Sequence, residues 1–157
     1  MLVGEQTDVR ACGVADIRSR PDLVAEHYAE VEPEVLDRAP DWDTYVLLEQ
    51  AGSLLVYGAF VDSQMVGYVM AIVGSRHLHW PALTAHVDSL YVAPAHRGHV
   101  GRRLLRTVER VAAARAIEQG IGRCAVSVGA RAGSELARML PALGYGEREV
   151  VYLKEIP

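Results

Sequence analysis

A strand that runs through a glycine-containing turn directly into a long helix constrains this chain's fold more than any other feature. The strand-like run at 84–92 stops before Pro94, a turn with Gly98 and Gly101 follows, and a helical pattern starts there. A second strand-like run comes after the helix, at 123–128. A strand–helix–strand unit of this length requires a parallel crossover connection within one sheet.

A predicted hairpin precedes this unit. Two strand-like runs, 54–61 and 65–73, are separated by a short polar turn, which requires antiparallel pairing. Helical patterns precede the hairpin, and one or two last strands are expected over 145–156. The sequence therefore predicts an α/β (α+β) fold: a mixed, mostly antiparallel central sheet of six to seven strands flanked by about four helices. No linker or repeat divides the chain, so we expect a single domain over 1–157.

Composition excludes several classes of protein. The 157 residues are 50% hydrophobic and carry a formal net charge of −4, which is typical of one folded domain and not of a disordered or strongly basic chain. No apolar run is long enough to span a bilayer, and the first residues lack the pattern of a secretion signal. Cys12 and Cys124 have no metal-like spacing and suggest a reducing compartment. We expect a cytoplasmic protein with no membrane association and no metal.

The turn after the strand at 84–92 has the chemistry of a phosphate site. Glycines allow backbone N–H groups to approach a ligand closely, and the first turn of a helix adds unpaired donors. Six of the sixteen basic residues lie between Arg97 and Arg115, with Glu109 the single acid among them. A tight strand-to-helix turn without a ligand is the alternative interpretation. Nucleic-acid binding by these arginines is disfavoured, because they lie on several helix faces and the whole chain is acidic.

This segment resembles the coenzyme-A-binding core of the GNAT superfamily, the GCN5-related N-acetyltransferases. The matching residues are Leu90-Tyr91-Val92-Ala93-Pro94, Arg97-Gly98, Gly101, Leu104-Leu105 and, later, Leu143-Gly144-Tyr145. The resemblance covers about residues 54–153. His99 stands where the family usually has a glycine, a spacing similar to that of a phage and mobile-element subgroup, which also shares a patch like His77-Leu78-His79-Trp80.

The resemblance implies that acetyl-coenzyme A binds between the strands at 84–92 and 123–128, with its pantetheine arm along the first strand and its pyrophosphate on the turn. The cofactor-binding residues that it implies are Leu90, Tyr91, Val92, Arg97, Gly98, His99, Val100, Gly101, Arg102 and Arg103. An acceptor amine would attack the thioester directly. Dimerisation is common in the family, so a homodimer is possible.

The resemblance also directs attention to a base and an acid. The base position matches Asp88, whose alternative role is backbone bonding at a strand edge, and His86 lies on the same face of the strand. The family's usual tyrosine acid is replaced by Leu140. Tyr91, Tyr145 and Tyr152 are possible substitutes, although each also suits the core. The candidate catalytic set is therefore Asp88, His86 and, of these tyrosines, Tyr91.

The function that follows from the resemblance is acetyl-coenzyme-A-dependent N-acetylation of a primary amine on a small molecule or a protein. A sensor or structural module that binds acyl-coenzyme A without turnover is the alternative. Seven acidic residues between Glu26 and Asp43 either attract a cationic amine or form a solvated surface.

Overall fold

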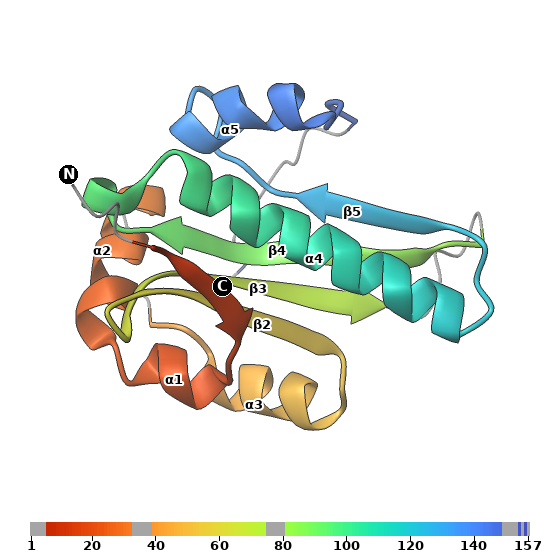
Figure 1. Ribbon diagram of the computed structural model, residues 1–157, viewed down its shortest axis with the longest axis horizontal. Coiled ribbons are helices and arrows are strands. Elements are labelled where there is room, and N and C mark those ends of the chain that lie inside the picture. Colours follow the sequence, from red (N-terminus) through yellow and green to blue (C-terminus); the bar gives the residue numbers. More distant parts are fainter. Residues whose placement is uncertain (1–5, 33–38, 75–80, 149–153, 155, 157) are drawn as a thin grey trace.

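The computed structural model describes residues 6–32, 39–74, 81–148, 154 and 156. The strands are β1 (Asp8–Ala11), β2 (Leu54–Val61), β3 (Gln64–Gly74), β4 (Leu83–Val92) and β5 (Cys124–Val128). They form one sheet in the order β1-β2-β3-β4-β5 (Figure 1). The pairings from β1 to β4 are antiparallel, whereas β4 and β5 are parallel and joined by the predicted helical crossover.

Helices cover both faces of this sheet. They are α1 (Val14–Arg18), α2 (Pro21–Val31), α3 (Trp42–Gln50), α4 (His99–Glu118) and α5 (Glu135–Met139), with 3₁₀ turns η1 (Pro94–His96) and η2 (Leu140–Leu143). Figure 1 shows α4 running along one face. Its side chains Leu104, Leu105 and Val108 are buried in one core cluster. A second cluster includes Val14 and Ile17 of α1 and Leu23 and Val24 of α2. The sheet thus separates two hydrophobic cores.

The fold class is as predicted, but the element counts differ. The described residues contain five strands where six to seven were expected, and the segment predicted to supply the last strands lies mainly at 149–153, outside the described residues. The same residues contain five α-helices where about four were expected, because α1 has only five residues and no clear periodic pattern. None of the described helices is long and apolar enough to cross a membrane.

The β4 strand contains the irregularity that creates the site. In its pairing with β3, Ser89 lies opposite Met70 and Val87 lies opposite Ala71, so Asp88 is an extra residue, a β-bulge. The parallel pairing with β5 ends at the same point, with Val87 opposite Val128. Beyond Asp88 the strand therefore continues beside β3 with its other edge open.

Candidate active site

The open edge of β4 presents backbone groups to the space between β4 and β5. Ala93 N donates to Val66 O of β3 at 2.8 Å, so the alternation of the strand turns the N–H and C=O of Leu90 and Val92 away from β3. The carbonyl of Val92 accepts a hydrogen bond from Arg97 Nε at 2.9 Å. The remaining groups of Leu90 and Val92 are placed to pair with an extended ligand, as an added strand would.

The bulge also places two consecutive polar side chains on one face of the sheet. Val87 and Leu90 both pack against the core cluster under α4, so Asp88 and Ser89 between them face the opposite side, toward α2 and α3. The hydroxyl of Tyr45 in α3 donates to Asp88 Oδ2, and Ser89 Oγ lies 3.4 Å from the same oxygen. The carboxylate of Asp88, the candidate base, therefore lies at the point where β4 and β5 separate.

The turn before α4 has the geometry of an anion site at its first glycine. Gly98 is the N-cap of α4 with a φ of 102°, which L side chains rarely adopt, and no atom lies within 4 Å of the position of an added Cβ. Gly101 lies within the first turn of the 20-residue helix and is buried. The structure thus requires glycine for its backbone angles at Gly98 but not at Gly101, although the sequence suggested two permissive sites.

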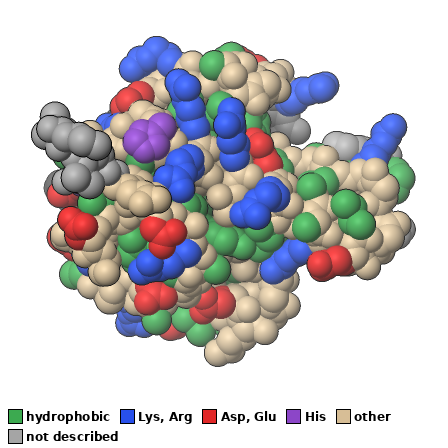
Figure 2. Space-filling view, in the orientation of Figure 1, with side chains coloured by type: hydrophobic (Ala, Val, Ile, Leu, Met, Phe, Trp, Pro, Cys, Tyr) green, Lys and Arg blue, Asp and Glu red, His purple; other side chains and the backbone are tan. Residues whose placement is uncertain are grey.

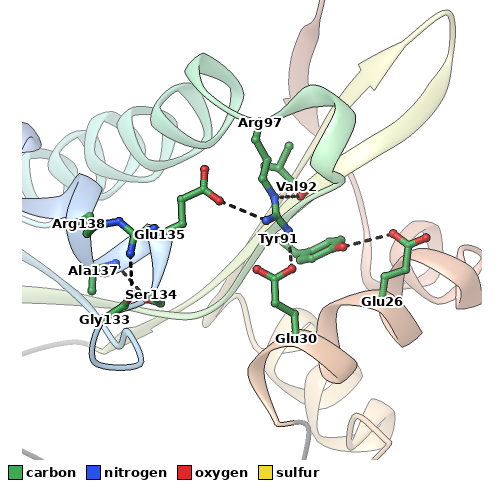
Figure 3. Close-up of polar contacts among 10 residues, drawn as sticks. All are labelled: Glu26, Glu30, Tyr91, Val92, Arg97, Gly133, Ser134, Glu135, Ala137 and Arg138. Carbon is green, nitrogen blue, oxygen red and sulfur yellow. Dashed lines mark hydrogen bonds and ion pairs between the residues drawn. The ribbon is translucent and has the colours of Figure 1, made fainter.

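Arg97 joins this turn to two helices on the sides of the cleft (Figure 3). Its guanidinium forms an ion pair with Glu30 of α2 and donates from Nη1 to Glu135 Oε2 at 3.2 Å. The same group lies 5.6 Å from the centre of the Tyr91 ring. Every guanidinium nitrogen of Arg97 is therefore engaged, two of them with carboxylates that sequence analysis did not single out.

A cleft of about 550 Å³ opens beside Asp88, between α2, α3, the open part of β4 and the segment after β5. Five carboxylates and one arginine are among its lining residues: Glu30, Glu32, Asp41, Asp88, Glu135 and Arg131. A smaller pocket of about 100 Å³ adjoins it and is lined by Leu90, Val92, Gly98, Gly101 and Arg97, among others. The two share Glu30, Leu90, Tyr91, Glu135 and Leu136, so an apolar slot leads past Arg97 into an acidic cleft.

His27 of α2 and Tyr91 of β4 are among the residues that line this cleft. His27 is 5% exposed and its ring stacks on that of Tyr91, with centroids 5.0 Å apart. Its Nδ1 is hydrogen-bonded to the hydroxyl of Tyr68 at 2.7 Å. Burial lowers the pKa of His27 to about 4, against the opposing effect of Glu30 and Asp88, so its imidazole is neutral at pH 7. Sequence analysis did not identify His27, because a single histidine on a helix face carries no specific signal.

Of the other two candidate catalytic residues, Tyr91 lines the same cleft as Asp88, whereas His86 is not among its lining residues. His86 shares the face of Asp88, as predicted, but is exposed and its Nδ1 is bonded to Ser127 Oγ of β5 at 2.9 Å. The hydroxyl of Tyr91 donates to Glu26 Oε2 at 3.3 Å, and burial raises the pKa of this phenol. The structure thus brings Asp88 to the cleft, and it gives the polar groups of His86 and Tyr91 other partners.

The predicted cofactor-binding residues divide in the same way. Leu90, Tyr91, Val92, Arg97, Gly98 and Gly101 line the smaller pocket, whereas the side chain of Val100 is buried in the core. His99 and Arg102 are exposed in the first turn of α4. Arg103 was predicted to bind the cofactor, but its Nη1 donates to the carbonyl of Thr7 at 2.6 Å and ties α4 to the start of β1. Figure 2 shows arginine side chains spread over this face of the molecule.

None of the described tyrosines occupies the position of the family's usual acid. Leu140 is 9% exposed and packs in the core below α4. The hydroxyl of Tyr145 donates to Glu109 Oε1 of α4 at 2.7 Å, and Tyr152 lies outside the described residues.

The model of the acetyltransferase (GNAT) family matches residues 17–136, which is most of the chain and includes the open edge of β4, the glycine turn and α4. The chain belongs to the GNAT acetyltransferase family. No curated protein sequence matches it significantly.

Solved structures of GNAT proteins share the fold over nearly the whole chain. A ribosomal-protein-alanine N-acetyltransferase from Brucella melitensis biovar Abortus 2308 has a TM-score of 0.73 and 20% identity, covering 97% of this chain and 99% of its own. Aminoglycoside N-acetyltransferase AAC(6')-Iy, solved with coenzyme A, has a TM-score of 0.68 and 16% identity, with 99% and 98% covered. Glucosamine-6-phosphate N-acetyltransferase from Arabidopsis thaliana has a TM-score of 0.68 and 12% identity, with 98% and 100% covered.

The described part of this GNAT chain contains no group of three or more histidine, cysteine, aspartate or glutamate side chains that could hold a metal ion. The histidine–tryptophan patch His77-Leu78-His79-Trp80 lies outside the described residues.

Proposed function

We propose that this chain transfers an acetyl group from acetyl-coenzyme A to a primary amine. The observation that carries the proposal is the separation of β4 from β5 at the Asp88 bulge. It leaves an extended backbone edge at Leu90 and Val92 that leads from the glycine turn to a carboxylate. Those elements fit the parts of the cosubstrate in order: phosphates at the turn, an extended pantetheine arm at the edge, and the reacting group beside Asp88.

The residues present supply what the transfer needs from the protein. Acetyl-coenzyme A, when bound, provides a thioester carbonyl that an amine nitrogen attacks, forming the C–N bond as the C–S bond breaks. An alkyl ammonium has a pKa near 10.4, so its neutral form costs about 4.6 kcal/mol at pH 7. The carboxylate of Asp88 accepts the amine proton, directly or through one water, and passes it to solvent. We assign no proton transfer to Tyr91 or His86, because both are bonded elsewhere.

The lining of the larger cleft supports a cationic acceptor. Five carboxylates and one arginine line this space, and two of the carboxylates, Glu30 and Glu135, are paired with Arg97. The remaining excess of acidic groups favours approach of an ammonium group and disfavours an anionic acceptor. The solved relatives act, by their names, on aminoglycosides, a ribosomal protein or an amino sugar phosphate. A small molecule with one or more amino groups fits the acidic cleft best.

A thiol-release assay with acetyl-coenzyme A and a panel of amines tests this function. Asp88→Asn should lower kcat about 100-fold or more while the Kd for coenzyme A stays unchanged. Asp62→Asn in the hairpin turn is the matched control and should keep full activity. If the wild-type chain binds coenzyme A but acetylates no amine, it is the non-catalytic acyl-coenzyme-A-binding module. If Asp88→Asn retains the wild-type kcat, Asp88 is not the base.

A further inference from the structure

The bulge in β4 makes the Asp88 carboxylate dependent on a side chain from α3. Because Asp88 and Ser89 both face away from α4, they meet the helices on the other side of the sheet. The phenol of Tyr45 reaches them from a position 43 residues earlier in the chain, with its hydroxyl bonded to Asp88 Oδ2 and 3.5 Å from Ser89 Oγ. No sequence pattern links these residues.

The two carboxylate oxygens of Asp88 have different surroundings. Oδ2 accepts from Tyr45, and Ser89 Oγ lies 3.4 Å from it. No side-chain partner of Oδ1 is present among the described residues, and Asp88 lines the acidic cleft. One oxygen is thus held in place by the protein, and the other remains for a ligand proton.

The helix that carries Tyr45 is itself fixed in position. The Asp41 carboxylate caps its first turn, accepting from Thr44 N at 3.1 Å. Glu49 near its other end accepts from Val14 N of α1 at 2.9 Å. Trp42 and Tyr45 both pack against the second core cluster. The Tyr45 hydroxyl is therefore delivered to Asp88 by a helix tied down at both ends.

We propose that Tyr45 is a positioning residue for acetyl transfer, which holds Asp88 by Oδ2 so that Oδ1 faces the attacking amine. This inference rests on the proposed function, since it concerns the base of that reaction. Holding a carboxylate in one orientation places the proton acceptor at the nitrogen before the reaction begins. The hydroxyl acts through Asp88 and not on the substrate.

Tyr45 is not a replacement for the missing tyrosine acid. Burial, and after it the bond to Asp88, raise the pKa of its hydroxyl above the ordinary value of 10. Proton donation by Tyr45 to a leaving thiolate would place a tyrosinate directly against the Asp88 carboxylate, and two negative charges in contact disfavour that state. The phenol therefore keeps its proton and serves as a hydrogen-bond donor throughout.

Tyr45→Phe removes the hydroxyl and retains the ring that packs in the core. The hydrogen bond has a charged acceptor, so its loss should lower kcat about 10- to 100-fold. The Kd for coenzyme A and the KM for acetyl-coenzyme A should stay within about two-fold of wild type, because the phenol lies on the acceptor side of the bulge. Tyr145→Phe is the matched control, since it removes another tyrosine–carboxylate bond, to Glu109, and should leave kcat unchanged.

A double-mutant cycle separates positioning from a general structural effect. In the Asp88→Asn background, Tyr45→Phe should lower kcat by less than about two-fold, because the group that it positions is already disabled. A multiplicative loss in the double variant would overturn the inference. So would a wild-type kcat in Tyr45→Phe when Asp88→Asn is inactive, and that result would leave the proposed function standing. Full activity in Asp88→Asn would instead overturn both the assignment of the base and the role of Tyr45.

Discussion

The guanidinium of Arg97 is paired with the carboxylate of Glu30, so the turn before α4 is joined directly to α2 on the opposite side of the cleft (Figure 3). Glu135 at the start of α5 bonds to the same guanidinium. Two carboxylates thus hold the arginine that sits closest to the proposed phosphate turn. An anionic cosubstrate has to compete with Glu30 and Glu135 for the guanidinium of Arg97.

Glu30→Gln combined with Glu135→Gln should therefore strengthen binding of coenzyme A. Both ion pairs are partly exposed: the exposed fraction of the side chain is 25% for Arg97, 49% for Glu30 and 60% for Glu135. Each pair therefore stabilises the folded chain by only about 0.2–1 kcal/mol. The expected gain is about two- to five-fold in Kd, measured by calorimetry, and should shrink at high salt. Asp22→Asn, which breaks an arginine pair outside the cleft, is the control. Weaker binding in the double variant would contradict the competition.

The two glycines of the turn should respond differently to the same substitution. Gly98→Ala places a side chain at a φ of 102° and should lower the free energy of unfolding by about 1–3 kcal/mol. The Cβ added by Gly101→Ala, within α4, would meet only ordinary contacts, such as Met139 Cε at 3.8 Å. This variant should therefore raise the free energy of unfolding by about 0.5–1 kcal/mol. Urea denaturation of the two variants measures both effects. Equal losses of stability would show that the two backbone positions are equivalent.

Stability should depend on pH through His27. Its pKa is about 4 in the folded chain and near 6.5 when unfolded, so the unfolded state binds the proton more readily. The contribution of the neutral His27 ring to the free energy of unfolding is complete above pH 6.5. It is lost as the pH falls from 6.5 to 4, and the total loss is up to about 3 kcal/mol. His27→Gln should abolish this part of the pH dependence in urea titrations at pH 7 and pH 4.5. The control variant His86→Gln changes an exposed histidine and should keep the pH dependence of stability seen in the wild-type chain.

Local patterns account for most of the elements that surround the site. The hairpin strands, the strand at 84–92 and the helix after the glycine turn lie within a few residues of their predicted bounds. Asp62 and Ser63 adopt positive φ values of 47° and 67°, as a tight hairpin turn requires. α5 ends at Met139, and Pro141 lies in the 3₁₀ turn η2 that follows, since proline cannot continue the helical hydrogen bonding. These features follow from side-chain periodicity and turn chemistry, which act over short stretches of chain.

The sequence by itself determined the fold class, the glycine turn and the position of Asp88 on a strand. Only the tertiary structure decided that this strand has a bulge at Asp88, that Tyr45 holds one carboxylate oxygen there, and that Glu30 and Glu135 pair with Arg97. The same holds for the hydrogen bond from Arg103, which the family resemblance assigned to the cofactor, to the carbonyl of Thr7. The bulge, the Tyr45 bond, the Arg97 pairs and the Arg103 bond share one physical reason. The place of a bulge and the packing of helices against the sheet set which distant side chains meet, and the spacing of nearby residues specifies neither.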